Sequence, residues 1–242
     1  FLPGLAWPGC FVCTPATFAQ MKSLIISTLL GALLCSSAMA QDLALKVEHE
    51  TVSLSADGVT RITRFAERLI RRDQQSWIAR ILPAGAHEEA EHHAGAKGHK
   101  HMDVAAAARW VVRQGDDRLQ LRLVNTHEKM LIDVAPTDYA NVGFDGRWTT
   151  ASQLLDPEQI RRMQPIKRSA PAGCQWYEGK SREARVQVLW DEKAEFPRRI
   201  ESANHNGTQR STMVANREPM PVSMPWAALK GYVQKEYSDL LD

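Results

Sequence analysis

The chain has little cysteine, no large excess of charge of either sign and no long apolar run. Each of these shortages excludes a class of protein. Four cysteines in 242 residues are too few for a fold built on disulfides. The formal net charge of +2 excludes a strongly basic nucleic-acid binder and an acidic disordered tail. The apolar run at 24–34 is well short of the roughly 20 residues that span a bilayer, so we expect no membrane-spanning segment in the mature chain.

The sequence also lacks the motifs that anchor common enzyme classes. It contains no GxSxG elbow, no phosphate-binding loop and no SxxK, and the zinc-protease pattern HExxH is absent. No set of nucleophile and base can be assembled from it. We therefore expect a non-enzymatic binding or accessory protein, with no nucleic acid among its partners.

The segment that begins at Met21 has the pattern of a secretory signal. Lys22 supplies a positive charge, residues 24–34 form an apolar stretch of the usual length, and small residues precede a cleavage site near Ala40. We predict that 21–40 is a signal peptide and that the mature protein is periplasmic.

The remaining chain is predicted to be one globular domain over 41–242. Residues 1–20 are interpreted as an untranslated or removed extension. Lipid attachment at Cys35 is an alternative, but Leu34 stands where a lipoprotein signal has a small residue. After cleavage only Cys174 remains, and an internal disulfide is impossible.

The hydrophobic pattern of this domain is mainly that of strands. Apolar residues alternate with polar ones at 43–47 and 119–123, and Asn206-Gly207 is the strongest hairpin signal. Residues 60–72 fit either a helix or a long strand, and we favour a strand because strands flank them. Residues 104–114 are also ambiguous, since Asp103 would cap a helix there.

Helical signals are few. Asp156 followed by a proline predicts a short helix that ends before Pro165, and Pro225 opens a predicted C-terminal helix. The predicted fold class is mainly β (α+β), a curved antiparallel sheet or half-barrel with a few short helices and the C-terminal helix.

One part of the predicted meander resembles a known superfamily. The segments Val186-Gln-Val-Leu-Trp190-Asp191 and Phe196-Pro197-Arg-Arg-Ile-Glu201, joined by a turn, resemble the periplasmic outer-membrane lipoprotein carrier (LolA-like) superfamily. The resemblance covers about 35 residues of the 242. It implies a half-barrel around an apolar cavity for acyl chains or a partner, and it identifies no functional residue. The corresponding hypothesis is a carrier or sensor that binds a lipophilic ligand or an envelope protein.

A histidine-rich loop at 83–102 supports an alternative function. Imidazole nitrogens bind zinc and copper at neutral pH, and a flexible loop suits metal buffering or delivery better than catalysis. The alternative is thus a metal-binding accessory protein with zinc or copper as its cofactor, or else a solvated insert without a specific role. The candidate ligands are His87, His92, His93, His99 and His101.

Two further features are candidate contact surfaces. The glycine-punctuated loop 142–148 carries Phe144 and Trp148, which would contact a ligand or partner if the loop is a lid. The same two aromatics would instead be held in the core if the loop is a pair of turns. Arginines are frequent at 61–80 and 161–168 and would form a cationic rim or simply a solvated face.

Overall fold

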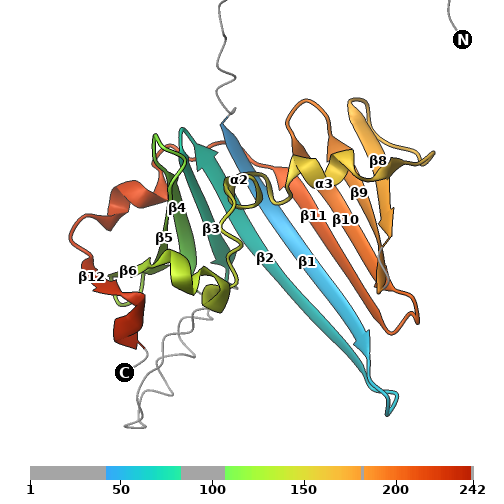
Figure 1. The fold of residues 1–242 in the computed structure, drawn as a ribbon, viewed down its shortest axis with the longest axis horizontal. Helices are drawn as coiled ribbons and strands as arrows, with labels where there is room; N and C mark the ends of the chain where they lie inside the picture. Colours follow the sequence, from blue (N-terminus) through green and yellow to red (C-terminus); the bar gives the residue numbers. More distant parts are fainter. Residues whose placement is uncertain (1–41, 83–106, 181–182, 241–242) are drawn as a thin grey trace, which may run out of the picture. The chain divides into compact units, whose positions relative to one another are not determined.

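The computed structural model describes residues 42–82, 107–180 and 183–240. Within these residues, twelve strands form one sheet in the order β12-β6-β5-β4-β3-β2-β1-β11-β10-β9-β8-β7 (Figure 1). Neighbouring strands are antiparallel, except that β12 runs parallel to β6. The strands are β1 (Leu43–Leu54), β2 (Thr60–Arg72), β3 (Gln75–Ile81), β4 (Ala108–Arg113), β5 (Leu119–Asn125), β6 (Met130–Val134), β7 (Gln164–Pro165), β8 (Cys174–Lys180), β9 (Ala184–Asp191), β10 (Phe196–Asn204), β11 (Gln209–Arg217) and β12 (Val233–Glu236).

Five short helices interrupt the strand order in the described part of the chain. They are the 3-10 helices η1 (Pro136–Val142), η2 (Pro225–Leu229) and η3 (Tyr237–Leu240) and the α-helices α2 (Trp148–Gln153) and α3 (Pro157–Arg161). Helix α3 confirms the predicted cap, because the Asp156 side chain accepts a hydrogen bond from the Glu158 N–H and Pro157 occupies the first turn. The fold class read from the sequence, a mainly β curved antiparallel sheet with short helices, is therefore confirmed.

The local turn signals place the hairpins as expected. Strands β10 and β11 are joined at Asn206-Gly207, where Gly207 has a φ of 72° that a residue with a side chain rarely adopts. Residues 60–72, ambiguous in the sequence, form β2, which pairs with β1 along its whole length. The two strands make a long hairpin that extends beyond β3 (Figure 1).

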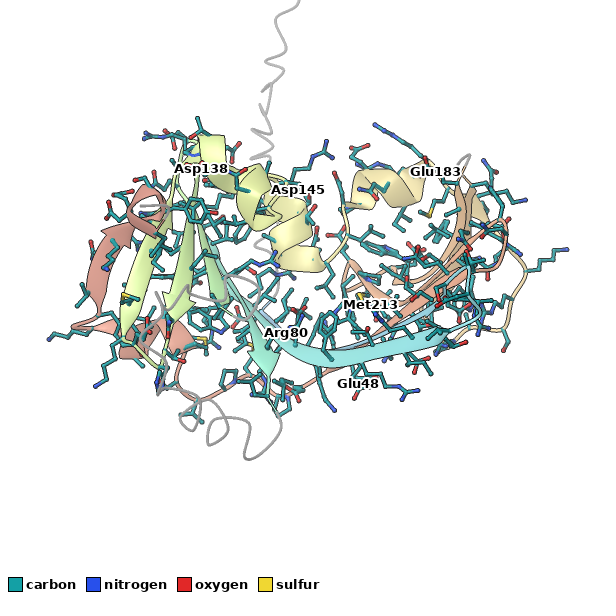
Figure 2. The ribbon with its side chains drawn as sticks, turned by 90° about the horizontal axis from the view of Figure 1, so that it is seen from below. Glu48, Arg80, Asp138, Asp145, Glu183 and Met213 are labelled. Carbon is teal, nitrogen blue, oxygen red and sulfur yellow. The ribbon has the colours of Figure 1, made fainter. Side chains whose placement is uncertain are left out.

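The main core lies on the concave face of the sheet, which we call the inner face. Alternation places odd-numbered residues of β1 on this face, and Figure 2 shows α2 and α3 on the same side as Met213, with Glu48 on the opposite side. Phe196 is fully buried there in a cluster with Leu43, Leu45 and Leu69. Arg71 is also buried and donates a hydrogen bond to the Ser152 carbonyl, so it ties α2 to the sheet.

Among the residues that the structure describes, the opposite, outer face is covered mainly over β2–β6. The chain that follows β11 crosses this face, and Met220, Met224 and Trp226 pack on a second cluster that includes Ile70 and Trp77. Over β1, β11 and β10 the outer face is not covered by any described residue in this way. This half-covered face contains the largest hollows described below.

One ambiguous segment is resolved as a strand, and the predicted C-terminal helix is wrong. Residues 108–113 form β4 rather than a helix, because β3 and β5 pair with them on both sides and supply long-range hydrogen bonds that no local pattern reveals. The single C-terminal helix is replaced by η2, β12 and η3. Gly231 breaks it with a φ of 87°, after which Val233 pairs with Met130 of β6.

Candidate functional site

A small pocket lies on the inner face beneath α2. Its volume is about 180 Å³, below the roughly 300–1,000 Å³ of pockets that take drug-sized ligands. The pocket lies between β3, β4 and the loop that leads into α2. It is lined by Ser76, Ile78, Arg109, Val111, Gly143, Phe144, Asp145, Thr150 and Ala151.

Phe144 and Trp148, the two aromatic residues of the 142–148 loop, lie at this pocket and in the core beside it. Phe144 lines the pocket but is only 8% exposed, and its ring packs edge-on against Tyr139 with centroids 4.8 Å apart. Trp148 is half-buried and packs against the core cluster to which Phe144 belongs. Gly143 and Gly146 both have positive φ, which the two turns of the loop require. Contact of Phe144 and Trp148 with a ligand stays a prediction.

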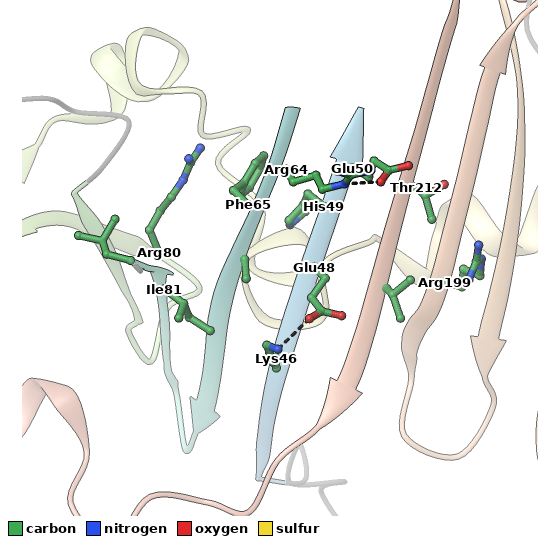
Figure 3. Close-up of a pocket in the computed structure, with 13 residues that line it drawn as sticks. Lys46, Glu48, His49, Glu50, Arg64, Phe65, Arg80, Ile81, Arg199 and Thr212 are labelled. Carbon is green, nitrogen blue, oxygen red and sulfur yellow. Dashed lines mark hydrogen bonds and ion pairs between the residues drawn. The ribbon is translucent and has the colours of Figure 1, made fainter. Parts of the chain in front are cut away.

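The outer face carries a much larger open groove over β1, β2 and β11. Its volume is about 800 Å³, within the range of ligand sites (Figure 3). By strand alternation, Ala66, Ile81 and Val214 form an apolar floor on this face. The full lining is Lys46, Glu48, His49, Glu50, Arg64, Phe65, Ala66, Arg80, Ile81, Leu82, Arg199, Thr212 and Val214.

Ion pairs form the walls of this outer groove. Lys46 Nζ lies 2.7 Å from Glu48 Oε1, and Arg64 Nε lies 2.6 Å from Glu50 Oε2 (Figure 3). The hydrogen bond from Lys46 to Glu48 raises the pKa of the lysine. Because these pairs are largely exposed, each contributes little to stability, and their charges can be re-paired with a polar ligand group at small cost.

An apolar hollow adjoins the outer groove and shares Arg80 and Ile81 with it. Its volume is about 450 Å³. Its floor is formed by Ile70, Trp77 and Ala79. One side is closed by the ion pair of Arg68 and Glu218, in which Arg68 Nε lies 2.7 Å from Glu218 Oε2. Its cover is the proline-rich chain after β11, which contributes Pro219, Pro221 and Pro225.

The other end of the outer groove is polar. A hollow of about 250 Å³ shares Thr212 with it and is lined by charged groups that include Arg185 and Arg210. Beside it on β8, Glu178 accepts hydrogen bonds from Gln187 and Arg185, and these lower the pKa of Glu178 to about 2. Along the outer face the hollows thus run from apolar to polar.

The depressed pKa of Glu178 predicts acid sensitivity at this edge of the sheet. A carboxylate with a lowered folded-state pKa stabilises the protein above its unfolded pKa, here about 4.5, and the stabilisation is lost as pH falls toward about 2. We expect the melting temperature of the wild type to fall more than that of Glu178→Gln between pH 5 and pH 2. Equal slopes in thermal melts of the two proteins over this range, roughly pH 5 to 2, would contradict the assignment.

His49, Phe65 and Arg80 form a stacked row of side chains on the inner face. The same three residues are also among those that line the outer groove. The rings of His49 and Phe65 stack with centroids 4.4 Å apart, and the Arg80 guanidinium lies 3.9 Å from the Phe65 centroid. His49 Nε2 lies 3.3 Å from Glu67 Oε2 without a hydrogen-bond partner. Burial would raise the pKa of Glu67, but His49, Arg109 and Arg80 outweigh it and the pKa is lowered.

The predicted metal ligands His87, His92, His93, His99 and His101 lie outside the described residues, as do the predicted signal peptide and extension. Over 42–82, 107–180 and 183–240, no three His, Cys, Asp or Glu side chains gather as a metal site. No helix in these ranges is long and apolar enough to cross a membrane. Cys174 is a free thiol at the start of β8, partly exposed, with Arg198 Nη1 3.9 Å from its Sγ.

The sequence analysis placed arginines of 61–80 on a possible cationic rim, and Arg64, Arg68 and Arg80 do line the outer-face hollows, but it missed the apolar residues of these hollows. Their floor comes from strands β2 and β3 and their cover from the chain after β11, and no local pattern joins these segments. Two signals were available. Ile62, Ala66 and Ile70 recur at every fourth position, which places them on one face of a strand, and prolines cluster at 219–225.

Comparisons with known proteins give matches in structure but not in sequence. No protein-family model matches the chain, and no curated protein matches it significantly. Among solved structures, a LolA superfamily protein from Nitrosomonas europaea matches with 9% identity over 75% of this chain and 88% of its own, at a TM-score of 0.28. A putative outer membrane lipoprotein-sorting protein domain from Vibrio parahaemolyticus matches with 9% identity over 77% and 89%, at a TM-score of 0.34.

A third match is an uncharacterized conserved protein from Thermus thermophilus, with 7% identity over 80% of this chain and 90% of its own and a TM-score of 0.40. The matching structures thus include the superfamily that residues 186–201 resemble. At such low identities and TM-scores, the function proposed below rests on the residues of this chain.

Proposed function

We propose that this protein is a non-enzymatic periplasmic carrier or sensor that binds a lipophilic ligand, with a polar end, in the outer-face groove and the apolar hollow beside it. The observation that carries the proposal is the continuity of the two hollows. They share Arg80 and Ile81, and their volumes of about 800 and 450 Å³ suit an extended molecule.

The lining assigns an orientation to the ligand. The hollow around Ala79, Trp77 and Pro221 would take the apolar end, where each methylene removed from water contributes about 0.8 kcal/mol. The polar end would lie over β1 and β11, where Lys46 and Arg199 can re-pair with an acidic or hydrogen-bonding group. The pocket near Phe144 is too small for the same ligand.

Native mass spectrometry of protein purified from the periplasm tests this proposal. We expect a fraction of the protein to carry a bound lipid whose mass is released by organic extraction and matches an envelope lipid. If the periplasmic protein has only its own mass, and lipid added as mixed micelles leaves that mass unchanged, the proposal is wrong.

Metal binding by the histidine-rich loop is a separate proposal, supported by five histidines between positions 87 and 101. We expect calorimetric titration of the mature protein with zinc or copper to show binding that is lost when residues 88–101 are deleted. Binding that survives the deletion would exclude these histidines as the ligands. The deletion leaves in place every described residue that lines the two hollows, so we expect lipid binding to be retained.

A further inference from the structure

The long β1–β2 hairpin has one strand edge that no described residue covers. On its β1 side, β11 pairs as far as Ser53, so that edge is closed. On its β2 side, β3 pairs only from Ala66 onward, so residues 60–65 have no strand beside them among the residues that the structure describes. Figure 1 shows this end of the hairpin extending past β3.

In the sequence, a proline follows two positions after the last residue of β3. In the register of β2 and β3, Ala66 is paired with Ile81. If this register were extended by two residues, position 83, a proline, would be paired with Arg64. Proline has no backbone N–H and cannot donate a ladder hydrogen bond at this position. A ladder that continued β3 in this register would therefore lack the hydrogen bond from position 83.

The pattern of hydrogen bonds shows which backbone groups are left open. The Leu54 N–H donates to the Thr208 carbonyl on β11, so the backbone groups of Leu54 point away from β2. Because direction alternates along antiparallel strands, Arg61, Thr63 and Phe65 bond to β1. The N–H and C=O groups of Ile62 and Arg64 then point to the open edge.

We propose that this edge binds an extended peptide segment of a partner protein by strand addition, with acidic residues alternating with apolar ones. Unpaired N–H and C=O groups at a sheet edge are the recognition element of this binding mode, and side-chain contacts set its specificity. The inference does not require the outer-face hollows to hold a ligand.

The charges and apolar groups along the edge define the peptide's chemistry. On the inner face, Arg61 forms no ion pair with any described residue, and the Arg80 guanidinium lies over the Phe65 ring beside the edge, so acidic side chains of an added strand would pair there. On the outer face, Ile62 is 51% exposed and Leu54 45% exposed. An apolar side chain at the alternate positions would cover Ile62, which is on the edge strand itself, whereas Leu54 is on β1, one strand farther from the edge.

The same arginines have a simpler explanation, since charged residues on an edge strand also protect against aggregation. The two roles differ in what they predict. Protection alone requires that the edge reject every added strand. Recognition requires that it accept an acidic–apolar strand and reject a basic one.

Amide exchange measured by NMR on the whole mature protein tests the proposal, with a blocked nine-residue peptide of alternating valine and glutamate as the probe. We expect the peptide to slow exchange at Ile62 and Arg64. Exchange at Thr63 and Phe65, whose amides already bond to β1, should stay unchanged. A matched valine–lysine peptide should have no effect.

A charge-reversal variant tests the specificity. We expect Arg61→Glu to weaken binding of the glutamate peptide about ten-fold, because an exposed attraction becomes a repulsion, and to allow the lysine peptide to bind. Arg210→Glu is the matched control, since Arg210 is an exposed cation on β11, away from the edge. Its peptide affinities should equal those of the wild type.

Several results would overturn the proposal. Slow exchange at Ile62 and Arg64 in the dilute free protein would mean that another part of this chain covers the edge. Protection that rises with protein concentration alone would mean that the edge pairs with a second copy. Absence of alternating protection at saturating peptide would mean that the arginines only guard the edge.

Discussion

Replacing Phe196 with alanine is expected to lower the free energy of unfolding by about 3–5 kcal/mol, which is the usual cost of removing a fully buried aromatic ring. Phe196 has no exposed surface and packs against Leu43, Leu45 and Leu69 in the inner-face core. Those strands are held in place by the sheet, so the surroundings can collapse only partly into the cavity. Urea unfolding followed by circular dichroism measures the loss.

The matched control for this substitution is Val233→Ala on β12. Val233 is 57% exposed, so its truncation should change the free energy of unfolding by no more than about 0.5 kcal/mol. If Phe196→Ala costs as little as this control, the concave face is not the packed core of the protein.

Ala79→Trp is expected to lower the affinity for a lipophilic ligand at least ten-fold. Ala79 is a small residue in the floor of the apolar hollow, between Trp77 and Ile81 on the same face of β3. An indole at this position would stand in the space assigned to the acyl chain. Titration with a fluorescent fatty acid measures the affinity, and circular dichroism verifies that the variant folds.

The matched control is Ala203→Trp, the same change on the outer face of β10, where Ala203 lines the polar hollow. We expect Ala203→Trp to leave the affinity for the fluorescent fatty acid within about two-fold of the wild-type value, because Ala203 does not line the apolar hollow. Equal losses in both variants would show that the probe does not occupy the hollow beneath the prolines.

The parts of the fold that were predictable are those that a few consecutive residues determine. Asn206-Gly207 specifies a tight hairpin by its backbone preferences, and Asp156-Pro157 specifies a helix start by a side-chain hydrogen bond. Strand 60–72 was correctly favoured because its neighbours are strands. These features need no knowledge of distant contacts.

The parts that were missed depend on residues far apart in the chain. Residues 108–113 are strand only because β3 and β5 lie on either side, and β12 exists only because β6 is beside it. The candidate site has the same origin, since Ala79 and Pro221 line one hollow although about 140 positions of sequence separate them. Local periodicity places a residue on a face but does not say what covers that face.

We propose that the ligand site lies on the outer face of the sheet rather than under the helices. Photo-cross-linking with a diazirine fatty acid, followed by peptide mass spectrometry, tests it most directly. The structure predicts labels on the hollow around Ala66, Ala79 and Pro221, and loss of these labels in Ala79→Trp. Labels confined to the inner pocket at Val111 and Phe144 would contradict the account and place the ligand at the loop 142–148.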